Sequence, residues 1–126
     1  MDYPIGDMLI RMKNAARAGR DSFVVPYSGF IKRLGELLVK SGYLEKMEAQ
    51  DQSLKMDLKY KGRRALVSEI KLFSKPGLRN YIKTKDLNKL HKSGRSLIII
   101  STSLGLMSLE EAKKQKVGGE LLCEVS

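Results

Sequence analysis

The chain has 126 residues, 42% of them apolar, which suits one domain or two small lobes that share an interface. Charged residues make up 30%, no apolar run approaches the roughly 20 residues of a membrane helix, and the first residues lack the basic start of a signal peptide. The single cysteine, Cys123, excludes an internal disulfide framework, fits a reducing compartment and lies in an apolar stretch typical of a core thiol. We therefore expect a soluble cytoplasmic protein that does not bind a membrane.

The net charge of +10 is concentrated in the second half of the chain. Residues 63–126 hold 13 basic and 6 acidic side chains, whereas residues 1–62 hold 11 and 8. Between Lys71 and Arg95, eight cations stand against one acid, Asp86. Such a stripe is typical of a protein that binds a polyanion, and nucleic acid is the first candidate, although a solvated face would show the same charge.

The first half of the chain predicts a small α+β lobe. Apolar residues at helical spacing indicate two amphipathic helices, and the alternation of Leu54, Met56 and Leu58 with charged residues indicates a half-buried strand. The expected elements are a helix over residues 4–18, a strand over 22–25, a helix from the N-cap Ser28 to Ser41, and strands over 43–47 and 54–60 around a turn at 51–53.

The second half predicts a mostly antiparallel β lobe with one short helix, so the fold class is α+β with two lobes. The charged segment Lys61–Arg64 marks the boundary, which gives lobes of residues 1–62 and 63–126. The expected elements are strands over 65–73 and 78–82 around a turn at 74–77, a helical turn over 86–90, a strand over 97–100, a helix opened by the capping box Ser108–Glu111, and a strand over 121–125.

The sequence contains no recognisable set of catalytic residues. The single histidine, His91, is interpreted as a surface residue, and with one cysteine it leaves no zinc ligand set. No phosphate-binding P-loop is present, and Gly118-Gly119 lacks the spacing of a dinucleotide-binding fingerprint. Ser103 has no base near it in the sequence. We therefore expect neither an enzyme nor a bound metal or cofactor.

Three adjacent hydroxyl residues, Ser101–Ser103, follow the apolar run 97–100 and precede Gly105. Hydroxyls are poor core material because each needs a hydrogen-bond partner when it is buried. We expect them on a loop between two strands, beside Gly118-Gly119-Glu120, where they form a short surface that donates and accepts hydrogen bonds.

Three separated motifs resemble the family of the eighth protein of the small ribosomal subunit, over nearly the whole chain. Pro4–Asn14 is similar to the family's opening, and Ser74–Tyr81 to its serine–basic–proline–glycine–leucine–arginine–x–tyrosine turn. The most specific match is Ser101-Thr102-Ser103-x-Gly105-x-Met107 together with Gly118-Gly119-Glu120. Two departures are Leu104, where the family usually has lysine, and Ser108-Leu109, where it usually has threonine-aspartate.

The resemblance implies a two-lobe fold that binds 16S rRNA mostly through the C-terminal lobe. It implies a monomer bound to a distorted helix in the rRNA central domain, early in small-subunit assembly and beside neighbouring ribosomal proteins. In some bacteria the family also represses translation from its own operon mRNA. These expectations agree with the physical reading, because proteins recognise A-form RNA through phosphates, 2′-hydroxyls and unstacked bases.

The candidate RNA-binding residues carry hydroxyls, cations, one aromatic ring and one carboxylate, and three of them are glycines. They are Ser101, Thr102, Ser103, Gly105, Gly118, Gly119, Glu120, Lys75, Arg79, Tyr81, Arg11 and Lys13. Structural roles without RNA contact stay open for four of these residues: Tyr81 as cross-strand packing, Glu120 as an acceptor that closes the glycine turn, and Arg11 and Lys13 as a solvated helix face. Two other classes also stay open, a DNA-binding regulator, which the absence of a short helix-turn-helix turn disfavours, and a protein–protein adaptor.

Overall fold

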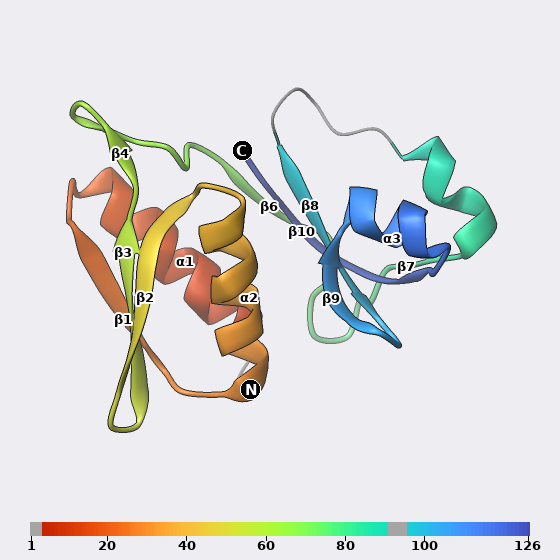
Figure 1. Cartoon of the computed structure of the whole chain (residues 1–126), viewed down its shortest axis with the longest axis horizontal. Helices are drawn as coiled ribbons and strands as arrows, with labels where there is room; N and C mark the ends of the chain where they lie inside the picture. Colours follow the sequence, from red (N-terminus) through yellow and green to blue (C-terminus); the bar gives the residue numbers. More distant parts are fainter. Residues whose placement is uncertain (1–3, 91–95) are drawn as a thin grey trace. The chain divides into compact units, whose positions relative to one another are not determined.

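The structure, a computed structural model, describes residues 4–90 and 96–126 and divides into two compact units, Met1–Glu69 and Ile70–Ser126 (Figure 1). The first unit carries two helices on one face of a three-stranded antiparallel sheet, in the order β1-β3-β2. Its elements are α1 (Pro4–Arg17), β1 (Ser22–Pro26), α2 (Gly29–Lys40), β2 (Leu44–Gln50), β3 (Ser53–Leu58), β4 (Tyr60–Lys61) and β5 (Arg64–Ala65).

Local sequence signals explain the elements of the first unit. The Oγ of Ser28 accepts a hydrogen bond from the backbone N–H of Ile31 at 3.0 Å and caps α2. Leu54, Met56 and Leu58 of β3 are buried, while Lys55 and Asp57 project from the other face of the sheet. The β4–β5 hairpin, which Gly62 turns at φ +65°, contains the boundary expected after residue 62, whereas the compact units divide after Glu69.

The second unit is organised around β10, its last strand. This strand pairs antiparallel with β8 along one edge, and with β6 and then β7 along the other edge. The elements are β6 (Ile70–Leu72), β7 (Tyr81–Ile82), the 3-10 helix η1 (Thr84–Lys89), β8 (Leu97–Thr102), β9 (Gly105–Ser108), α3 (Leu109–Gln115) and β10 (Gly119–Val125).

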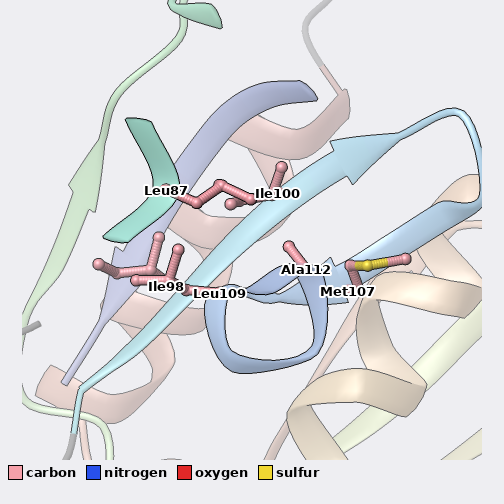
Figure 2. Packing of buried hydrophobic residues seen from close by; sticks show 6 residues of the cluster. All are labelled: Leu87, Ile98, Ile100, Met107, Leu109 and Ala112. Atoms are coloured by element: carbon pink, nitrogen blue, oxygen red, sulfur yellow. The ribbon is translucent and has the colours of Figure 1, made fainter. Parts of the chain in front are cut away.

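One apolar cluster joins the helices of the second unit to its sheet. Figure 2 shows its buried side chains, contributed by η1, β8, β9 and α3: Leu87, Ile98, Ile100, Met107, Leu109 and Ala112. Cys123 of β10 is also fully buried, and burial raises the pKa of its thiol to about 12 because the thiolate would lose its hydration. Its interpretation as a core thiol is therefore confirmed.

The expected α+β class with two small lobes is confirmed, but three local predictions are wrong. Residues 65–73 and 78–82 do not pair as a hairpin, because β6 and β7 each pair with β10 instead. Residues 65–73 do not form one strand, because β5 ends at Ala65 and the next strand, β6, begins at Ile70. Nor do residues 101–105 form a loop, because β8 runs to Thr102 and β9 starts at Gly105, which leaves only Ser103 and Leu104 in the turn. The expected surface histidine, His91, lies outside the described residues.

Candidate nucleic-acid interface

The register of the second unit's sheet aligns four side chains across one end of it. Tyr81 of β7 pairs with Glu120 of β10, Glu120 with Ser101 of β8, and Ser101 with Leu106 of β9. Directly opposed residues of antiparallel strands project to the same face. This cross-strand row therefore places a phenol, a carboxylate, a hydroxyl and an apolar side chain side by side, and Tyr81 is 73% exposed.

An ion pair ties the loop before β7 to this row. The Nη1 of Arg79 donates to the Oε2 of Glu120 at 3.1 Å, and the carboxylate is the more buried partner. A guanidinium carries five N–H donors, so an interaction with one carboxylate is compatible with another to a phosphate. The pair gives an acidic residue a structural role in this basic unit, since Glu120 orients a cation. The two residues are 41 positions apart, and no sequence pattern had linked them.

The β8–β9 turn is held by the hydroxyl of Thr102. Its Oγ1 donates to the carbonyl of Gly105 at 2.8 Å and accepts from the backbone N–H of Leu104 at 3.1 Å. A hydroxyl has one proton to donate, so that of Thr102 serves the turn. Gly105 takes φ +119°, a conformation that side chains disfavour. The turn thus presents Ser103 and Leu104 outward, with Leu104 66% exposed.

Gly118 and Gly119 lie where backbones approach closely. A Cβ on Gly118 would collide with the carbonyl oxygen of Ile82 and lie 2.8 Å from the nitrogen of Thr84. A Cβ on Gly119 would collide with the carbonyl oxygen of Ser101 and lie 2.9 Å from its carbonyl carbon. Both glycines therefore have a packing role that holds β10 against its neighbours at the cross-strand row.

The remaining predicted residues lie in two different places. Lys75 is exposed in the turn that precedes Arg79, within the second unit. Arg11 and Lys13 belong to α1 of the first unit. The guanidinium of Arg11 contacts Asp7 at 3.1 Å and donates to the carbonyl of Val24 at 3.0 Å, beside a pocket between α1 and β1 that Arg20 also lines.

The side chains of the cross-strand row and of the β8–β9 turn offer hydrogen bonds and charge contacts at the surface of the second unit. In the part of the chain that the structure describes, no three His, Cys, Asp or Glu residues gather as metal ligands. No helix within residues 4–90 and 96–126 is long and apolar enough to cross a membrane. The fold and the site together define a basic α+β protein whose second unit presents hydroxyls, cations and exposed apolar groups at one end of a sheet.

Comparison with known proteins identifies the family. The family model described as Ribosomal protein S8 matches residues 3–126. The small ribosomal subunit protein uS8 of Mycoplasmopsis agalactiae is 39% identical over 126 residues, which cover 97% of this chain and 95% of that protein. The uS8 proteins of Anaeromyxobacter sp. strain Fw109-5 and Dictyoglomus thermophilum are 41% and 36% identical, over 97% of this chain and 96% and 95% of theirs.

The chain therefore belongs to the ribosomal protein S8 family, as its three motifs had suggested. It is a structural component of the small ribosomal subunit, and its family is one of ribosomal proteins rather than enzymes.

Proposed function

We propose that this small-subunit protein binds the central domain of 16S rRNA directly, in the cytoplasm and as a monomer, and helps to assemble the subunit. The observation that carries the proposal is the cross-strand row together with the outward β8–β9 turn. Hydroxyls, an exposed tyrosine and cations there match the groups that irregular RNA offers, namely 2′-hydroxyls, unstacked bases and phosphates.

In this proposal the polar side chains divide the recognition between backbone and bases. Ser101 and Ser103 donate to phosphates or 2′-hydroxyls and accept from exocyclic amines. Lys75 and Arg79 bind phosphates, and Glu120 holds the guanidinium of Arg79 in place. Tyr81 stacks on an unpaired base or a ribose, which its exposure allows and which base–aromatic contacts favour by about 1–3 kcal/mol.

The other predicted residues have supporting roles. Thr102 shapes the turn, while Gly105, Gly118 and Gly119 allow the backbone geometry that presents the hydroxyls. Arg11 and Lys13 add phosphate contacts from the first unit, and the protein also contacts neighbouring ribosomal proteins in the subunit. An operon mRNA that offers the same irregular structure would compete for this site, which is how the protein would repress its own translation.

A filter-binding titration at two salt concentrations tests the proposal. It compares a central-domain 16S rRNA fragment with duplex DNA and an unrelated RNA hairpin, using the wild type and Ser103→Ala. We expect the rRNA fragment to bind most tightly at the higher salt. Ser103→Ala removes a hydrogen bond to the RNA and should weaken rRNA binding about tenfold, a cost of about 1.4 kcal/mol. Because Ser103 is exposed in the turn, the substitution should not destabilise the fold.

Each contrary outcome selects another class. Equal binding of all three ligands, lost at high salt, would leave only nonspecific attraction by the basic stripe. A preference for duplex DNA would support a DNA-binding regulator. Weak binding of every nucleic acid would support a protein–protein adaptor.

A further inference from the structure

The segment between β6 and β7 leaves the edge of β10 and rejoins it. β6 pairs with Cys123–Val125 and β7 with Gly119–Glu120, so residues 74–80 form a loop between two stretches of one edge. Within the loop, Lys75 and Leu78 exchange both backbone hydrogen bonds at 2.9 Å. The loop carries Lys75 and Arg79, and it leads directly into Tyr81.

A buried hydroxyl closes the base of this loop. Ser74 is 0% exposed, and its Oγ donates to the carbonyl of Leu121 at 2.6 Å. The same Oγ accepts from the backbone N–H of Asn80 at 3.0 Å, while the N–H of Leu121 donates to the carbonyl of Asn80 at 2.8 Å. The hydroxyl therefore stands between an N–H and a carbonyl that would bond directly in a regular ladder, and it joins three separate points of the chain.

Further contacts strengthen this Ser74 junction, which comprises Ser74, Asn80 and Leu121. The side-chain amide of Asn80 donates to the carbonyl of Phe73, and the N–H of Phe73 donates to the carbonyl of Leu122 at 2.9 Å. On its other edge, β10 shifts register against β8 between Leu121 and Cys123. A bulge disrupts regular pairing, so the hydroxyl supplies a hydrogen bond where the strand is irregular.

We infer that Ser74 is a positioning residue for RNA binding: its hydroxyl fixes the loop so that Lys75, Arg79 and Tyr81 face the same ligand. The inference rests on the proposed RNA-binding function of these three residues. Ser74 itself is 0% exposed, so its side chain is not on the surface that would meet the RNA. Its effect is transmitted through Asn80, which lies between Arg79 and Tyr81 in the chain and whose backbone N–H the hydroxyl holds.

Ser96 provides a matched control within the same unit. Among the described residues, Ser74 and Ser96 are the two buried polar side chains, at 0% and 1% exposure. The Oγ of Ser96 donates to the Oε2 of Glu124 at 2.6 Å. This bond lies at the start of β8 and the end of β10, whereas the cross-strand row lies at the opposite ends of both strands. Removing it should cost stability without moving the loop.

The experiment compares Ser74→Ala with Ser96→Ala in the full chain. Amide hydrogen exchange of residues 75–81 is measured without RNA, and affinity for the central-domain rRNA fragment is measured over a salt series. We expect both variants to unfold more easily. Only Ser74→Ala should speed exchange in the loop, weaken rRNA binding tenfold or more, and reduce the slope of log affinity against log salt by about 2 as Lys75 and Arg79 lose their phosphates.

Two further variants keep the test decisive if Ser74→Ala does not fold. Ser74→Thr retains the hydroxyl and should retain the salt slope. Asn80→Ala removes only the exposed side-chain amide and should shift exchange and affinity in the same direction but less, with Asn88→Ala in η1 as its exposed control.

The inference is overturned if Ser74→Ala, or Asn80→Ala in its place, keeps the wild-type salt slope and affinity, or if Ser96→Ala changes both equally. A wild type that does not prefer the rRNA fragment would instead overturn the proposed function, and the inference with it. The two failures differ in the wild-type titration, so they cannot be confused.

Discussion

Gly119 is the residue where β10 and β8 allow no side chain. An added Cβ would collide with the Ser101 carbonyl group, which is backbone and cannot rotate away. We predict that Gly119→Ala forces the strands apart, destabilises the protein by about 1–3 kcal/mol, and displaces Ser101 and Glu120 from their shared row. Chemical denaturation measures the first effect, and rRNA affinity measures the second.

A control for this substitution exists in the first unit. Gly29 opens α2, does not have a positive φ, and has no atom within 4 Å of the position of an added Cβ. Gly29→Ala should leave stability unchanged or slightly raised, because alanine favours helix. If the two substitutions changed the free energy of unfolding equally, the close backbone contact at Gly119 would not be the reason that this position needs glycine.

At the scale of single residues, the sequence predicted which side chains gather at the site better than it predicted which residues they contact. The hydroxyl, cationic, acidic and aromatic candidates of the second unit do gather around β10, but the roles of two of them came only from the structure. Glu120 holds Arg79, and Thr102 holds its own turn. Such contacts depend on which strands pair, and pairing is set by long-range packing that local patterns do not encode.

The helices α2 and α3 are the elements that the sequence specified most directly, through their N-caps Ser28 and Ser108. The Oγ of Ser108 accepts from the backbone N–H of Glu111 at 3.2 Å at the start of α3, which is the serine half of the predicted capping box, while the carboxylate of Glu111 accepts from Gln115. We predict that Ser108→Ala lowers the free energy of unfolding by about 1 kcal/mol, because a backbone N–H loses its acceptor. Ser103→Ala, in the exposed turn four residues after Ile99, is the control and should be neutral in the same denaturation experiment.

The strands show what local signals leave undetermined. Residues 65–73 and 78–82 look like the two arms of a hairpin around a Pro-Gly turn. In the structure both β6 and β7 pair with β10 instead of with each other. Among the described residues, the isolated bridge between Lys75 and Leu78 is the part of that hairpin that forms. A turn motif constrains the chain only locally. The apolar strand β10 comes from the far end of the sequence and offers both segments a longer pairing partner.

At the scale of the whole molecule, the excess of positive charge is unevenly compensated. On the sheet of the first unit, Lys46 lies 2.9 Å from Glu48 and 3.9 Å from Asp57. The hydrogen bond from Lys46 and its positive charge lower the pKa of Glu48, and Glu48 in turn raises the pKa of Lys46. The loop of the second unit, by contrast, carries Lys75 in a stretch from Lys71 to Lys85 that contains no acidic residue.

This difference predicts which cations contribute to RNA affinity. Each phosphate that a lysine neutralises releases counterions, so replacing one contacting lysine should reduce the salt slope by about 1. We predict this reduction for Lys75→Gln, which leaves the backbone bonds of its turn intact. Lys46→Gln removes the same formal charge and should leave the slope unchanged, because Lys46 lies on the sheet of the first unit, where no RNA contact is proposed, and its ammonium group is bound to Glu48. The measurement is rRNA affinity over a salt series for both variants.

The paired design separates a local contact from a field effect. If affinity depended only on net charge, Lys75→Gln and Lys46→Gln would weaken binding equally, since each lowers the charge of +10 by one. Unequal slopes would locate the phosphate contact in the loop that the Ser74 junction holds. Equal slopes would contradict that location, and rRNA binding would then depend on the protein's overall field rather than on one surface.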